Sequence, residues 1–220
     1  MKNPIKYSLK TEVWPLLIFL ATVGLSFWVY PQLPEKVISH WDFNGKANGW
    51  TSREFYAIFF PALLAVIYAL FRVLPKFDPN SDRYKEFAGA YLAIRNSILL
   101  VLFIVFAAAS FANLGYIVNI CEIVAGAIGF IMIVLSNYFK KLKRNWFVGI
   151  RTPWTMSSEN VWNKTHLLGS KLFIFLGLSF ILIPWLAPVI GFLILFVEAI
   201  ILMPWIVIYS YVLYKNEKEK

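Results

Sequence analysis

The chain has 220 residues, of which 60% are hydrophobic and only 15% are charged, with a formal net charge of +9 and a single cysteine. Soluble domains are about half apolar and a quarter charged, so this composition excludes an ordinary soluble protein and favours an integral membrane protein. The lone Cys121 also excludes an intramolecular disulfide.

Six apolar segments approach the length needed to cross a bilayer, which takes about 17–25 mostly apolar residues. The first is expected to be a retained helix and not a signal peptide, because no small-residue cleavage pattern follows it. Very short connections join the third segment to the fourth and the fifth to the sixth, which predicts two antiparallel helical hairpins. The predicted spans are residues 13–30, 55–74, 96–112, 116–139, 172–187 and 189–214. We therefore predict an all-α polytopic membrane protein with a single membrane domain.

The distribution of positive charge predicts the orientation. With six spans both termini lie on one side, and that side collects 18 of the 21 Lys and Arg residues. Because Lys and Arg accumulate in short cytoplasmic loops, both termini are predicted to be cytoplasmic. Residues 31–54 then form an outward loop, and residues 140–171 form a cytoplasmic loop with an interfacial helix. Topology and anionic lipid headgroups account for the net charge, so direct nucleic-acid binding is not expected.

The outward loop, residues 31–54, is predicted to be compact. Its Asn-Gly pairs, at Asn44 and Asn48, favour tight turns with positive φ. His40 and Asp42 are two residues apart and would point to the same side of a strand. They could bind a metal together with nearby carboxylates, or relay a proton. The expected role is a hydrogen-bonded pair that stabilises the loop, and no metal is predicted.

The densest polar chemistry of the chain lies at residues 147–166. Gly149 permits a bend, and Thr152 is driven towards extended geometry by the following proline. A capped helix is predicted to follow, and it places Trp162 and His166 on one face. These residues could simply form a solvated interfacial loop. Alternatively, Arg151 and the neighbouring tryptophans form a docking surface for a carboxylate-bearing partner.

Two carboxylates are predicted inside the membrane, Glu122 early in the fourth span and Glu198 midway along the sixth. Such groups are costly there and usually face the bundle interior. Arg95 is expected to open the third span after a loop at 75–95, too far from Glu122 to pair with it. Glu198 is the better candidate for proton or cation handling or for contact with a membrane-embedded ligand. The alternative is a structural carboxyl.

Two segments resemble known families. The outward "LPEKVISHWDFNGKANGW" resembles the DUF1648 family, which covers residues 13–74. The cytoplasmic "NWFVGIRTPWTMSSENVWNKTHLLGSKLF" resembles the SdpI family, which covers residues 95–214. The residues that carry the second resemblance are Gly149, Arg151, Thr152, Pro153, Trp154, Thr155, Trp162, Asn163, His166 and Gly169.

The SdpI resemblance implies a bacterial plasma-membrane immunity protein that protects against a secreted antimicrobial peptide of the cannibalism type. It also implies a signal transducer that recruits a cytoplasmic transcriptional repressor. The peptide is then expected at His40, Trp41, Asp42, Asn44 and Gly45, and the repressor at the cytoplasmic signature. No cofactor is expected.

Two other functional classes remain open from the sequence. One is a small transporter or proton-coupled channel that uses Glu198. The other, less favoured, is a membrane enzyme that uses His40 and Asp42. The chain has only two histidines and neither the HExxH nor the GxSxG motif, which argues against an enzyme.

Overall fold

The computed structural model describes residues 3–219 and is mainly helical. Within these residues, six helices are long and apolar enough to cross a membrane, which confirms the predicted all-α polytopic fold. The helices are α1 (Leu9–Val29), α2 (Arg53–Phe77), α3 (Tyr84–Asn113), α4 (Ile120–Phe139), α5 (Pro153–Ser157), α6 (Glu159–Leu182) and α7 (Pro188–Lys218). Three single 3-10 turns are η1 (Tyr30–Gln32), η2 (Ser81–Arg83) and η3 (Ile183–Trp185), and two strands are β1 (Lys36–Trp41) and β2 (Ala47–Ser52).

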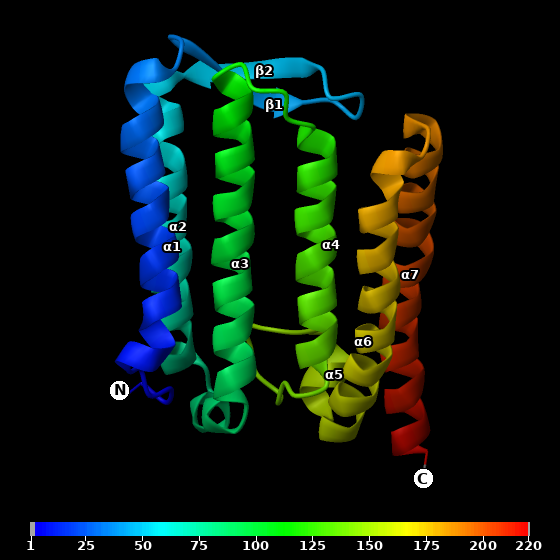
Figure 1. The fold of residues 1–220 in the computed structure, drawn as a ribbon. Helices are drawn as coiled ribbons and strands as arrows, with labels where there is room; N and C mark the ends of the chain where they lie inside the picture. Colours follow the sequence, from blue (N-terminus) through cyan, green and yellow to red (C-terminus); the bar gives the residue numbers. More distant parts are fainter. Residues whose placement is uncertain (1–2, 220) are drawn as a thin grey trace.

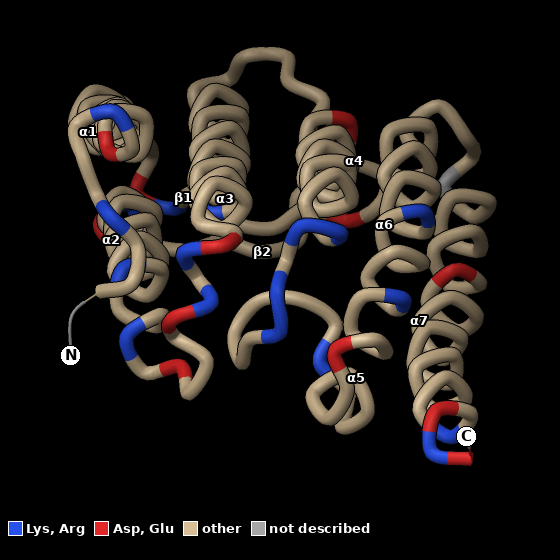
Figure 2. Tube along the Cα trace, turned by 90° about the horizontal axis from the view of Figure 1, so that it is seen from below, with Lys and Arg blue, Asp and Glu red and all other residues tan. Residues whose placement is uncertain are grey.

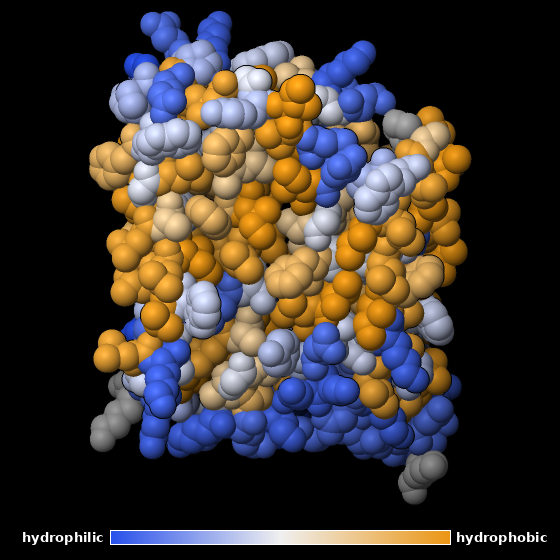
Figure 3. All heavy atoms as spheres, viewed as in Figure 1, coloured by the Kyte–Doolittle hydropathy of each residue, from blue (hydrophilic) through white to orange (hydrophobic). Residues whose placement is uncertain are grey.

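The six long helices stand side by side, with both termini at one end and the β-hairpin across the other (Figure 1). We call these the inner end and the outer end. A band of apolar side chains separates two polar ends (Figure 3), as a protein that spans a bilayer requires. Seen from the inner end, Lys and Arg gather on the loop between α2 and α3 and on the loop after α4 (Figure 2). This is the end that the charge distribution predicts to be cytoplasmic.

The outer loop folds as the turn signals predict. Strands β1 and β2 pair antiparallel, with irregular register around His40. Gly45 has φ +75° at the turn, a conformation that suits glycine. The side chain of Asn113, at the end of α3, accepts a hydrogen bond from the amide of Ile38 (2.8 Å) and donates one to its carbonyl (3.0 Å). Together with a small apolar cluster around the buried Val37, this fastens the hairpin to the bundle.

The third helix is longer than hydropathy predicts. Helix α3 begins at Tyr84, so most of the predicted loop at 75–95 is helical and Arg95 lies within a helix instead of opening a span. The guanidinium of Arg95 is completely buried and bonds both carboxylate oxygens of Glu12 (3.1 and 3.2 Å). The hydroxyl of Tyr68 donates to the same carboxylate (2.6 Å). The partner of Arg95 is therefore Glu12 of α1, whereas the sequence had suggested only Glu122 for comparison and placed it too far away.

The predicted interfacial helix is also corrected. The structure has a one-turn α5 and then a single helix, α6, that runs without a break from Glu159 into the fifth span. Ser158 caps it by accepting from the amide of Val161 (3.3 Å). Helices α4 and α6 touch at backbone level, since a Cβ built on Gly129 would lie 2.6 Å from the carbonyl oxygen of Gly177. This close approach requires small residues at the crossing.

Candidate functional site

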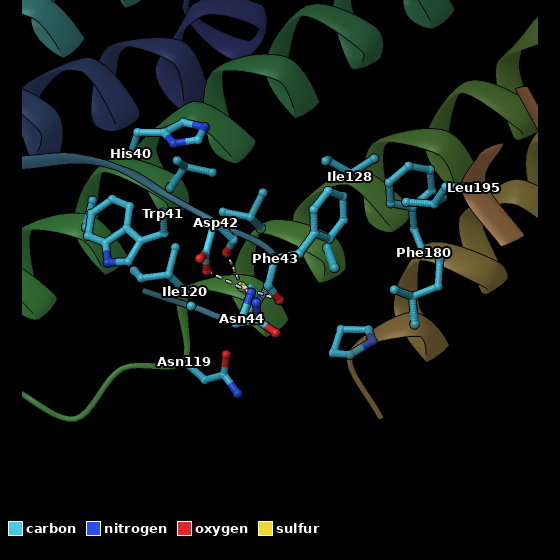
Figure 4. A pocket seen from close by; sticks show the side chains of 18 of the residues that line it. His40, Trp41, Asp42, Phe43, Asn44, Asn119, Ile120, Ile128, Phe180 and Leu195 are labelled. Atoms are coloured by element: carbon cyan, nitrogen blue, oxygen red, sulfur yellow. Dashed lines mark hydrogen bonds between the residues drawn. The ribbon is translucent and has the colours of Figure 1, made fainter. Parts of the chain in front are cut away.

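A pocket of about 670 Å³ opens beneath the β-hairpin at the outer end. Its lining comes from the hairpin, from α3 and α4, from the end of α6 and from the η3–α7 region. All five residues predicted for the outward site contribute to it: His40, Trp41, Asp42, Asn44 and Gly45. The structure therefore brings the predicted outer residues to one place (Figure 4).

The pocket walls are mainly apolar. Helices supply aliphatic and aromatic side chains from four parts of the chain: Val105, Ala109, Ile120, Val124, Ile128, Phe180, Ile183, Leu186 and Leu195. Figure 4 shows Ile128, Phe180 and Leu195 gathered on the side of the pocket away from His40. These residues could not be predicted from the sequence, because each is indistinguishable from a lipid-facing side chain until the helices are packed. An apolar cavity of this size with a few polar groups at its edge is typical of a ligand site.

The hairpin tip is held in place over the pocket. The Asp42 carboxylate accepts from the amides of Asn44 (2.8 Å) and Lys46 (2.9 Å), which fixes the turn. The Phe43 ring packs edge-on against Phe192 of α7, with centroids 6.1 Å apart. The hairpin therefore bridges α3 on one side and α7 on the other, and the pocket lies under this bridge.

The predicted hydrogen-bonded pair of His40 and Asp42 is not present in the described residues. The Nδ1 atom of His40 contacts the side-chain oxygen of Asn48 across the hairpin instead. Asp42 lies beyond the end of β1, where its side chain serves the turn. Among residues 3–219 no group of three His, Cys, Asp or Glu side chains is placed to hold a metal ion.

At the inner end, residues 140–152 form an ordered loop around the buried Asn145. The side-chain oxygen of Asn145 accepts from the amides of Phe147 (2.9 Å) and Val148 (2.7 Å), and its amide group donates to the carbonyl of Val148 (2.9 Å). The Asp78 carboxylate, from the α2–α3 connection, accepts from the amide of Trp146 (2.8 Å). The loop after α4 is thereby tied to the start of α3.

Gly149 and His166 form the centre of the SdpI-like signature. The amide of Ile150 donates to Nε2 of His166 (3.0 Å), so the ring proton lies on Nδ1, which donates to the carbonyl of Trp162 (2.8 Å). The Trp162 indole donates to the carbonyl of Leu142 (2.9 Å) and stacks on the histidine ring. Gly149 has φ +122° and no room for a side chain against these two rings.

The Arg-Thr-Pro-Trp segment joins this loop to α7. Thr152 caps α5 by accepting a hydrogen bond from the amide of Thr155 (3.2 Å). The Thr152 hydroxyl also forms a hydrogen bond with the hydroxyl of Ser210 on α7 (3.0 Å). Pro153 occupies the first position of α5, where no amide hydrogen is needed. The Trp154 ring packs against Tyr211 with centroids 5.1 Å apart.

Half of the ten signature residues are therefore buried. Trp162, His166 and Thr152 are buried and brace the loop, so they present no surface to a partner. Arg151 and Asn163 are exposed. Arg151 donates to the carbonyl of Trp146, a half-exposed residue that the sequence analysis did not select. The exposed surface of the inner loop is thus smaller than the docking surface expected from the sequence.

The two predicted intramembrane carboxylates differ. Glu122 lies in the first turn of α4 at the outer end, where its exposed carboxylate accepts a hydrogen bond from the cap residue Asn119 (2.6 Å). Glu198 is only 7% exposed, in the interior of α7. Neither of its carboxylate oxygens has a hydrogen-bond partner among the described residues. Burial without a hydrogen-bond partner is the environment in which the ionised form of a carboxyl group is least stable.

Comparison with known proteins adds two family matches. Residues 141–210 match the SdpI/YfhL protein family, and residues 17–66 match DUF1648, a domain of unknown function. Immunity protein SdpI of Bacillus subtilis (strain 168) is 25% identical over 169 residues, which cover 77% of this chain and 79% of that protein. No solved structure matches. The first match contains the inner signature and the second contains the β-hairpin.

Proposed function

From the membership of this chain in the SdpI/YfhL family, we propose that it is a bacterial plasma-membrane immunity protein that binds a secreted antimicrobial peptide at its outer end. The observation that supports this proposal is the pocket beneath the β-hairpin, to which all five outer residues selected from the sequence contribute. A secreted peptide meets the outer end first, and an apolar cavity suits the apolar side chains by which such a peptide enters a membrane.

The hairpin gives the proposed site its specificity. Its exposed aromatic residues Phe43 and Trp50 lie beside polar and turn residues, and rigid aromatic anchors of this kind are enriched where peptides and proteins bind. The Phe43–Phe192 contact closes one side of the pocket. We infer that an entering peptide side chain replaces this aromatic contact at the edge of the pocket.

The test is survival of a peptide-sensitive bacterium that expresses the protein. Expression should raise the inhibitory concentration of a cannibalism-type peptide relative to an empty vector. Leu195→Trp, which fills the pocket, should remove this protection. Leu193→Trp makes the same change at a lipid-exposed position of α7 and should leave protection intact. Lack of protection by the wild type, at normal abundance in the membrane, would contradict the proposal.

We further propose that the inner surface around Arg151 and Asn163 recruits a cytoplasmic transcriptional repressor. The support is the exposure of these two polar signature residues, whereas Thr152, Trp162 and His166 are buried. Arg151→Ala should lower membrane recruitment of a fluorescently tagged repressor and leave peptide survival unchanged. Recruitment that is unaffected by both Arg151→Ala and Asn163→Ala would argue against this surface.

A proton-coupled transporter is the second candidate function, and the buried Glu198 is the observation that favours it. Intramembrane carboxylates without partners recur in proton relays. Protein reconstituted in liposomes should then carry a proton flux that Glu198→Gln abolishes. Absence of flux in the wild type would reject this candidate.

A further inference from the structure

Glu198 is a buried carboxyl group of α7 that lies deeper in the bundle than the outer pocket and does not line it. Leu195 lines the pocket, and Glu198 is three residues further along α7, on the same helix face and about 4.5 Å deeper. Both belong to the side of α7 that packs inward, whereas neighbours such as Val197 and Ile200 are exposed to the apolar surroundings. The side chain of Glu198 is therefore buried in the bundle about one turn deeper than the pocket-lining Leu195.

The packing of α6 against α7 agrees with this depth of Glu198 in the bundle. A Cβ built on Gly191 would contact Ile183, and one built on Gly169 would contact Ile206, and these two contacts fix the antiparallel register of α6 and α7. In that register Glu198 lies opposite the segment around Gly177. One turn above Gly177, Phe180 lines the pocket.

Helix α4 closes the floor from the third side. Ile128 lines the pocket, and the next residue, Gly129, contacts Gly177 at backbone level. Helices α4 and α6 therefore touch just below the pocket-lining Ile128 and Phe180, at the depth at which Glu198 lies on α7. No side chain in the described part of the chain bonds its two oxygens.

The charges around the pocket have one sign. The lining contains the carboxylate of Asp42 at the hairpin turn and no lysine or arginine. Because Glu198 is buried one turn deeper along α7, a ligand that extends past the lining residues would meet a carboxylate at the mouth of the pocket and another beyond its deep end. An apolar molecule with a cationic group at its leading end complements this arrangement, because the cation would satisfy the deep carboxyl that no protein group satisfies.

We propose that the outer pocket binds an apolar ligand led by a primary ammonium group, and that Glu198 is the residue that pairs with this ammonium. A peptide offers such a group at its N-terminus or on a lysine. That the natural ligand is a peptide rests on the proposed immunity function, whereas the ammonium site rests on the pocket and Glu198 alone. A primary ammonium of a lipid headgroup shares this chemistry, but it would have to leave the headgroup layer to reach the pocket floor.

The proposal is tested with two photoreactive probes of identical diazirine-bearing alkyl chain, one ending in a primary amine and the other in an alcohol. The full-length protein is placed in lipid nanodiscs, irradiated with each probe, and the labelled residues are mapped by mass spectrometry. The amine should label the pocket-lining residues of the wild type about tenfold more than the alcohol, the factor that one hydrogen bond to a charged group provides. Equal labelling by the two probes in the wild type would overturn the proposal.

Matched variants locate the effect. Glu198→Gln, close in size, should reduce the amine preference to nearly equal labelling, whereas Glu122→Gln at the exposed outer end of α4 should keep it. Leu195→Trp should reduce labelling by both probes, which shows that the pocket is the site even if Glu198→Gln does not fold. An amine preference that survives in folded Glu198→Gln would overturn the role of Glu198. The immunity function is tested separately by the survival assay, in which no probe is present. Its failure can therefore be distinguished from failure of the ammonium site.

Discussion

Replacing Gly149 by alanine tests how the SdpI-like signature holds the inner loop. Gly149 has φ +122°, a conformation that L residues rarely adopt, and holding alanine there costs about 1–3 kcal/mol. The new Cβ would also lie 2.5 Å from Nε2 of His166 and 3.1 Å from the Trp162 ring. Making room breaks the hydrogen bond from the amide of Ile150 to the buried histidine, for about 1–3 kcal/mol more.

The expected loss of stability is therefore about 2–6 kcal/mol, or an apparent Tm lower by roughly 5–20 °C for a chain of this size. The assay is thermal unfolding of the purified protein in detergent. The matched control is Gly89→Ala on the exposed face of α3, where an added Cβ meets nothing within 4 Å. It should be neutral or stabilising by about 0.5–1 kcal/mol. Equal melting of the two variants would refute the account of Gly149.

Three other changes have definite expected results. Arg95→Leu should cost about 3–5 kcal/mol because it removes the fully buried cation of the Glu12 carboxylate and leaves only the longer ion pair with Arg72 (3.6 Å), and adding Glu12→Gln should recover part of this loss in a double-mutant cycle. Asn113→Ala should release the hairpin, seen as faster hydrogen exchange at residues 36–52 with little change in the helices; unchanged exchange would contradict its role. Thr152→Val removes a helix cap and a bond to α7, so it should lower stability by about 1–3 kcal/mol; a smaller change in apparent unfolding would show that the cap is dispensable.

Hydropathy predicted the number and order of the spans because partitioning of apolar side chains into a bilayer depends mainly on local composition. It misplaced the inner ends of α3 and α6. Both helices continue beyond the apolar segment through residues such as Tyr84 and Trp162, which are buried against protein and not against lipid. A hydropathy window cannot detect burial of this kind, because it arises from contacts between distant segments.

The candidate site was predicted in part. Turn residues and the alternation of side chains along a strand predicted the hairpin residues that line the pocket. The helical wall residues could not be predicted from the sequence, because Ile128, Phe180 and Leu195 resemble lipid-facing residues. The pairing of Arg95 with Glu12 was missed for a similar reason: 83 positions separate the two residues, and only the packing of α1 against α3 brings them together. The inner signature was recognised, but its main role in the structure is internal support.

Complementation of a Bacillus subtilis strain that lacks Immunity protein SdpI tests the central claim most directly. The chain is expressed in that strain, and survival is measured in the presence of the peptide against which the strain's own protein protects. We predict that the wild type and Leu193→Trp restore survival and that Leu195→Trp, present in the membrane at equal abundance, does not. Restoration by Leu195→Trp as well would contradict binding in the outer pocket, and failure of the wild type to restore survival would contradict immunity to this peptide.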